Sequence, residues 1–133
     1  MDDELTARIE ELLETPCWII DILPGRVPED KAKEYAELEK VFLYTESLKR
    51  KFYNVLMKLR CYFDFKVVMP ECDATVMKLW GLVGHKYLQI IVGDALLVLD
   101  PDDMYMSLYN PSDDMLEFVK SIAATEGMCV WKS

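Results

Sequence analysis

Apolar side chains recur at helical spacing in two segments of the chain that also carry many charges. In residues 3–14 the apolar positions fall at i, i+4, i+7 and i+8 counted from Leu5, which predicts an amphipathic helix. A longer stripe lies in residues 48–63 and comprises Leu48, Phe52, Val55, Leu56, Leu59 and Phe63. Each stripe covers one face of its helix, so we expect both helices to pack against a core.

The clearest strand signal is a hairpin. Residues 87–100 read YLQIIVGDALLVLD, two apolar runs joined by Gly93-Asp94. A two-residue connection with glycine first favours a type II′ turn between antiparallel strands. Alternate positions are apolar on both faces of this hairpin, so either helices cover both faces or one face meets a partner.

The other segments complete a mixed pattern of helices and strands. Further strands are predicted at residues 17–22, 65–69, 104–110 and 128–131. A further helix is predicted at residues 29–44, although residues 39–44 also fit a strand. Two more helices are predicted, one from an N-cap at Asp73 to Gly84 and one from an N-cap at Asn110 to Gly127. The sequence thus predicts a single α+β domain over residues 1–133, with an antiparallel or mixed sheet built around the 87–99 hairpin and helices packed against it.

The net charge of the chain limits the classes of molecule that it is expected to bind. The chain of 133 residues is 52% hydrophobic and carries a formal net charge of −9. Phosphates are repelled by such a surface, so we expect no nucleic-acid partner and interpret the basic run at residues 49–51 as a solvated helix face. No stretch approaches the roughly 18 apolar residues of a membrane helix, and the acidic N-terminal helix does not resemble a secretion signal. We therefore expect a cytoplasmic protein with no membrane partner.

Metal and cofactor chemistry finds little support in the sequence. The four cysteines, Cys17, Cys61, Cys72 and Cys129, form no CxxC pair, and His85 is the only histidine. Structural zinc sites use closely spaced ligand pairs, so we expect no metal and interpret most of the cysteines as core residues of a protein in a reducing compartment. Phosphate-loop, dinucleotide-binding and hydrolase motifs are lacking, so we also expect no cofactor.

The stretch PCWIIDILPGRVP, residues 16–28, places Asp21 near the end of an apolar strand. A carboxylate in an apolar wall would have a raised pKa and could act as a general acid. Alternatively, Asp21 lies at the rim of the core, where it ends the strand and accepts backbone N–H groups of the following loop. We favour the second interpretation and assign no catalytic residue.

Four stretches carry a resemblance to known proteins. Their sequences are CWIIDILPGRVP, KLRCYFDF, DDMYMSLYNP and ATEGMCVWK. Together they resemble a family of small uncharacterised bacterial proteins of unknown function, over most of the chain. The resemblance implies a free-standing bacterial domain, and it implies no activity, ligand or catalytic residue.

The favoured functional interpretation is a non-enzymatic protein-interaction or regulatory module that self-associates, as a homodimer. Its basis is the two-sided apolar hairpin and the alternating Tyr and Met residues of the 104–110 strand, a composition typical of interfaces. The interface candidates are Ile91, Leu96, Val98, Tyr105 and Tyr109.

The alternative is a small-molecule-binding protein or minor enzyme. Its pocket would lie between the sheet and the helix of residues 48–63. The candidate ligand-binding residues are Asp21, Cys17, Tyr62 and His85.

Overall fold

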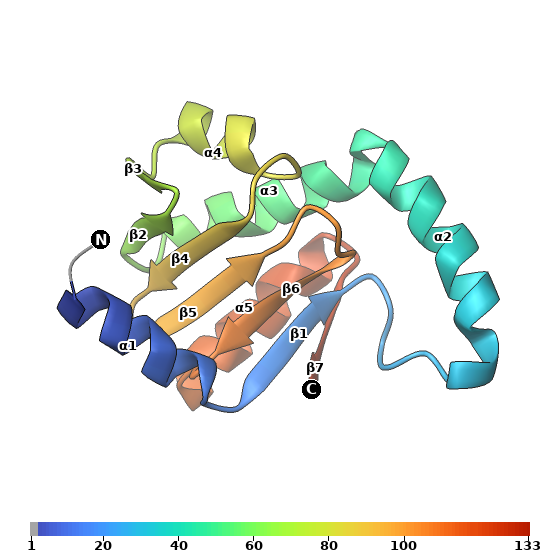
Figure 1. Cartoon of the computed structure of the whole chain (residues 1–133), viewed down its shortest axis with the longest axis horizontal. Coiled ribbons are helices and arrows are strands. Elements are labelled where there is room, and N and C mark those ends of the chain that lie inside the picture. The colour runs from blue at the N-terminus through green and yellow to red at the C-terminus, as the bar shows by residue number, and fades with distance from the viewer. Residues whose placement is uncertain (1–2) are drawn as a thin grey trace.

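The computed structural model describes residues 3–133, apart from the side chain of Tyr44, and shows one sheet with helices on both faces (Figure 1). The helices are α1 (Asp3–Leu13), the 3-10 helix η1 (Glu29–Lys31), α2 (Ala32–Tyr44), α3 (Glu46–Arg60), α4 (Val76–Leu82) and α5 (Asp113–Thr125). The strands are β1 (Cys17–Asp21), β2 (Phe65–Met69), β3 (Glu71–Cys72), β4 (Leu88–Val92), β5 (Ala95–Leu99), β6 (Tyr105–Tyr109) and β7 (Cys129–Lys132). Within the described residues, no helix combines the length and the apolar composition that crossing a membrane requires.

Seven strands form one antiparallel sheet in the order β3-β2-β4-β5-β6-β1-β7. The hairpin of β4 and β5 lies at its centre, and this confirms the predicted α+β fold with an antiparallel sheet built around residues 87–99. Strand β1 comes early in the chain but lies between β6 and β7, which come late. The sheet edge at β1 and β7 is therefore assembled from both ends of the sequence.

The turn of the central hairpin has the predicted form. Val92 pairs with Ala95, which leaves Gly93 and Asp94 as a two-residue connection. Gly93 has a φ of 57°, the positive value that the first position of a type II′ turn requires. The glycine therefore fixes the register of β4 against β5.

The main core lies between one face of the sheet and helices α3 and α5. In Figure 1 these helices run behind the sheet. Side chains that alternate along the strands, among them Ile20, Ile90 and Leu97, are fully buried against the stripe of α3 that includes Leu56. The helical stripe predicted at residues 48–63 is thus the cover of this face, and its burial is the main hydrophobic contribution to stability.

The opposite face of the sheet is covered in part by α1, which crosses in front of β5 in Figure 1. Ile9 and Leu12 of α1 pack on Ile91 and Leu96 of the hairpin, and Val68 of β2 joins this smaller cluster. Both faces of the hairpin are therefore covered by helices of the same chain, which was one of the two arrangements that its apolar faces predicted.

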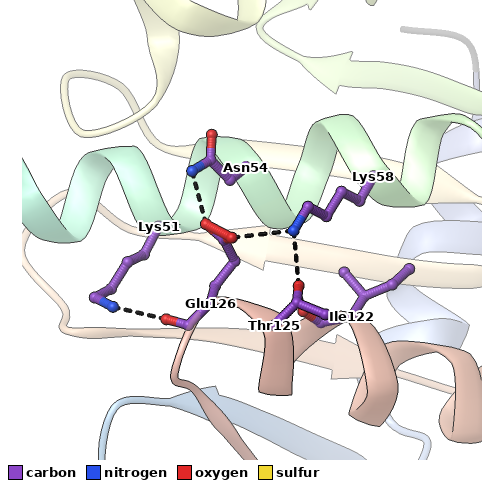
Figure 2. A network of polar contacts seen from close by, with 6 residues as sticks. All are labelled: Lys51, Asn54, Lys58, Ile122, Thr125 and Glu126. Carbon is purple, nitrogen blue, oxygen red and sulfur yellow. Dashed lines mark hydrogen bonds and ion pairs between the residues drawn. The ribbon is translucent and has the colours of Figure 1, made fainter.

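A polar network joins the end of α5 to Lys51, Asn54 and Lys58 on one face of α3 (Figure 2). The carboxylate of Glu126 accepts hydrogen bonds from Nδ2 of Asn54 at 2.6 Å and from Nζ of Lys58 at 3.1 Å. Lys58 also donates to Oγ1 of Thr125 at 2.7 Å, and Nζ of Lys51 donates to the backbone carbonyl of Glu126 at 2.6 Å. This network holds the C-terminal end of α5 on α3.

The N-terminal cap of α5 lies at Ser112, so the prediction of a cap at Asn110 was wrong. Oγ of Ser112 accepts the backbone N–H of Met115 at 3.1 Å. Asn110 instead adopts a φ of 61°, and its side-chain amide donates to the carbonyl of Asp94 at 3.3 Å. Asparagine adopts this left-handed conformation more readily than most residues do. Asn110 therefore turns the chain out of β6 before the helix begins.

Two other local expectations are corrected, and one short strand was not predicted. Helix α4 begins after Thr75, whose Oγ1 accepts the N–H of Lys78 at 3.3 Å, rather than after Asp73. Residues 39–44 belong to α2, so the alternative of a strand there was wrong. The sequence pattern also missed β3, because its two residues are too few to show an alternation.

Candidate functional site

A cavity of about 340 Å³ lies on the face of the sheet that α1 covers only in part. Strands β1, β6 and β7 form its floor, and the segment between β1 and α2 forms its wall. We call it the Asp21 pocket, and its lining comprises Ile19, Asp21, Gly25, Arg26, Val27, Pro28, Glu29, Ala32, Tyr35, Tyr105, Trp131 and Ser133. Its volume falls within the range of small-ligand sites, roughly 300–1,000 Å³.

Strand register brings the polar groups of this pocket together. Asp21 pairs with Tyr105 of β6, and Ile19 pairs with Trp131 of β7. Directly opposed residues of an antiparallel pair project from the same face, with Cβ atoms about 5 Å apart. The two pairs therefore place a carboxylate, a phenol and an indole on one surface, and Tyr35 of α2 faces them across the cavity.

Asp21 ends β1 in the way that the sequence predicts. Its Oδ1 accepts the backbone N–H of Leu23 at 3.2 Å, which starts the turn into Pro24 and Gly25. The side chain is nevertheless buried, since the residue is 4% exposed. The predicted role of Asp21 as an acceptor of a loop N–H group is confirmed, but its predicted position at the rim of the core is wrong, because the residue is buried and lines a cavity.

Burial determines the electrostatics of this carboxylate. Desolvation raises the pKa of Asp21, and backbone hydrogen bonds from Leu23 and Ile22 oppose the rise. Within residues 3–133 no basic side chain pairs with Asp21, although Arg26 lines the same pocket. The ionised carboxylate thus lacks a counter-charge among the described side chains.

The two phenols of the pocket lie in the negative field of nearby acids. Burial raises the pKa of Tyr35 to about 12, and the charges of Asp21 and Glu39 add to this rise. Burial likewise raises the pKa of Tyr105, with a further contribution from the charge of Asp103. Both phenols therefore stay protonated at neutral pH and can donate or accept hydrogen bonds.

Trp131 contributes a hydrogen-bond donor that has no partner among the described residues. Its Nε1–H is buried and finds no acceptor within the described part of the chain. A buried donor without a partner costs about 1–3 kcal/mol. An indole N–H of this kind can recognise an acceptor on a bound molecule.

The four predicted ligand-binding residues do not form one site. Asp21 lines the pocket, and Cys17 lies on the same strand and face but closer to Tyr109, outside the lining. Tyr62 is 63% exposed at the end of α3, and its ring packs on Phe118 with 5.0 Å between centroids.

His85 lines a second, smaller cavity of about 140 Å³. This cavity lies where the first turns of α3, at Leu48 and Phe52, meet the end of β5 at Leu99. The rest of the space between α3 and the sheet, where the sequence predicted a pocket, is filled by the main core. The Asp21 pocket is on the other face of the sheet.

The predicted interface residues are divided between the core and the surface. Ile91 and Leu96 are 6% and 0% exposed under α1, and Val98 and Tyr109 pack against the same cluster. Tyr105 instead lines the Asp21 pocket. The sequence did not predict Tyr35 or Trp131 as site residues, because no local pattern indicates that α2 and β7 lie beside the end of β1.

The side chains that line the Asp21 pocket can bind and orient a small molecule. Among residues 3–133, no three His, Cys, Asp or Glu side chains come close enough together to hold a metal ion. The pocket itself offers carboxylate, phenol, indole and guanidinium groups on apolar walls.

Comparison of the chain with protein-family models, with curated proteins and with solved structures finds no match in any of the three.

Proposed function

We propose that the protein is a non-catalytic binding domain that takes a small organic molecule into the Asp21 pocket. The observation that carries this proposal is the convergence of four polar or aromatic side chains, Asp21, Tyr35, Tyr105 and Trp131, on one cavity with apolar walls. Ligand sites in proteins typically combine an apolar lining with a few convergent polar groups.

The strongest support comes from two buried polar groups, Trp131 Nε1–H and the Asp21 carboxylate, whose burial the fold compensates only in part or not at all. The Trp131 N–H has no acceptor among the described residues, and the Asp21 carboxylate forms no ion pair with any of them. Such groups cost stability in the free protein. A ligand that supplies a partner to either group offsets part of this cost when it binds.

A fragment screen by NMR tests the proposal. The chain has three tryptophans, so ¹H–¹⁵N spectra contain three indole signals, and Trp131→Phe identifies the one that reports on the pocket. We expect a subset of soluble fragments to shift the Trp131 signal and leave those of Trp18 and Trp80 in place. A diverse library in which no fragment shifts the Trp131 signal overturns the proposal.

Self-association is a second proposal, and it rests on a different surface. Val98, Tyr105 and Tyr109 keep part of their area exposed on the face that α1 leaves open. Exposed aromatic and apolar side chains on one face favour contact with another chain. Native mass spectrometry at micromolar concentration tests it: a dimer that dissociates in Tyr109→Asp supports the proposal, and a monomer at all concentrations overturns it.

A further inference from the structure

The charges around the Asp21 pocket are unbalanced. Asp21 and Glu29 line it against the single cation Arg26, and neither Asp21 nor Glu29 forms an ion pair within the described residues. The charges of Glu39 and Asp103 also reach Tyr35 from outside the lining. The cavity is thus a region of negative potential.

The aromatic rings of the pocket also make no cation–π contact with the described cationic side chains. Elsewhere the chain places Nζ of Lys49 4.3 Å from the ring centroid of Trp80 and Nζ of Lys120 5.4 Å from that of Trp18. No such contact, and no ring–ring contact, involves Tyr35, Tyr105 or Trp131 within residues 3–133. Aromatic faces attract ammonium groups, so these rings can receive a cation from outside.

We infer that the ligand of the Asp21 pocket is a small organic cation, whose ammonium group pairs with the Asp21 carboxylate and whose carbon skeleton packs on Tyr35, Tyr105 and Trp131. This inference rests on the proposed function, because it names the chemical class of the molecule that the pocket takes. An ammonium group supplies both the charge and the hydrogen-bond donors that a buried carboxylate requires.

Three compounds with the same carbon chain separate charge from shape. Butylammonium, butan-1-ol and butyrate are titrated into ¹⁵N-labelled protein at neutral pH and constant ionic strength, and the Trp131 indole signal is followed. We expect butylammonium to bind about tenfold more tightly than butan-1-ol, which is the effect of about 1.4 kcal/mol. Butyrate should leave the signal unchanged, because the pocket repels anions.

Asp21→Asn keeps the shape of the side chain and removes its charge. In this variant we expect the tenfold preference for butylammonium over butan-1-ol to fall to near unity. Glu117→Gln is the matched control, since it removes one negative charge from an exposed site on α5, where the side chain is 76% exposed. This control should keep the wild-type preference.

The outcomes for the inference and for the proposed function are distinct. If butan-1-ol or butyrate binds as tightly as butylammonium, the pocket binds small molecules but the inference is overturned. If butylammonium does not shift the Trp131 signal, the inference is overturned whatever the fragment screen finds. The comparison of the three compounds uses the wild-type protein, so it decides the question even if a variant fails to fold.

Discussion

Asn54 and Glu126 connect two helices that are distant in sequence: Nδ2 of Asn54 on α3 lies 2.6 Å from Oε1 of Glu126 at the end of α5. Lys58 donates to the other carboxylate oxygen at 3.1 Å, so one acid accepts from two neighbours on the same helical face. Glu126 thus joins the two helices that cover the main core, and it lies next to β7, which carries Trp131 of the Asp21 pocket.

Glu126→Gln should destabilise the protein at neutral pH by about 1 kcal/mol, a modest value because the Lys58 side chain is 44% exposed. Burial acts to raise the pKa of Glu126, but hydrogen bonds from Asn54 and Lys58 and the charges of Lys58 and Lys51 outweigh it, so the pKa is lowered. A lowered folded-state pKa means that the stabilisation is present above the ordinary value of 4.5 and is lost as the pH falls through the folded value.

Urea denaturation of wild type and Glu126→Gln between pH 3 and pH 7 measures this difference. Glu117→Gln is the control, because the contact of Glu117 with Lys120 is a surface pair at 3.7 Å. We expect the control to lie within about 0.5 kcal/mol of wild type at every pH. A Glu126→Gln difference that stays constant with pH contradicts the proposed role of the carboxylate.

Asp21→Asn should stabilise the ligand-free protein at neutral pH. Burial raises the folded-state pKa of Asp21 above its ordinary value of 3.8, so ionisation costs more in the folded than in the unfolded chain. The stability is therefore full below the unfolded-state pKa and declines as the pH rises through the folded-state value. Asn can still accept the Leu23 N–H without a charge.

The melting temperature of Asp21→Asn should exceed that of wild type at pH 7, and the difference should close in acid. Asp102→Asn changes the same charge at an exposed loop position and serves as the control. If Asp21→Asn melts at a lower temperature than wild type at pH 7, the ionised carboxylate stabilises the folded protein and the prediction is wrong.

Gly93→Ala should destabilise the central hairpin by about 1–2 kcal/mol, because a Cβ disfavours the left-handed backbone conformation. Gly93 has a φ of 57°, and an added Cβ would also lie 3.3 Å from Cε of Met115. Gly81→Ala is the opposite case, since Gly81 lies within α4 and a Cβ there meets no atom within 4 Å. Chemical denaturation should show Gly81→Ala to be up to about 1 kcal/mol more stable than wild type. Equal effects of the two substitutions contradict this explanation.

Leu12→Asp should detach α1 from the sheet. Leu12 is 7% exposed on Ile91 and Leu96, and a buried charge without a partner costs several kcal/mol, which exceeds what a short helix gains from its contacts. Detachment exposes the apolar face of the hairpin, so we expect increased binding of the dye ANS and concentration-dependent association. Ala7→Asp places the same charge on the exposed face of α1 and should bind no more dye than wild type. Unchanged dye binding in Leu12→Asp shows that α1 does not protect this face.

The fold was largely predictable because its strongest signals are local. Gly93-Asp94 specifies the turn that centres the sheet, and the stripe from Leu48 to Phe63 specifies the helix that covers it. The helix caps were less predictable, since neighbouring residues compete for one role. Asn110 and Ser112 both suit a cap, and only the path of the chain out of β6 gives the cap to Ser112.

The candidate site was predictable only in part. Asp21 stood out because a charge in an apolar strand is locally unusual. Tyr35, Tyr105 and Trp131 join it through the position of α2 and through strand pairing between β1, β6 and β7, which no local pattern expresses. Periodicity shows which face a residue occupies, and the strand order decides which residues meet across strands.

The position of β1 between β6 and β7 has a kinetic consequence. Strands β4, β5 and β6 follow one another in the chain and pair with their sequence neighbours, so they can form early. Strand β1 can join them only by closing a long loop, and contacts of high sequence separation slow folding. Since the Asp21 pocket is built on β1 and on the β7 strand beside it, we expect this pocket to be completed in the last step of folding and to be the first region to open in native-state hydrogen exchange.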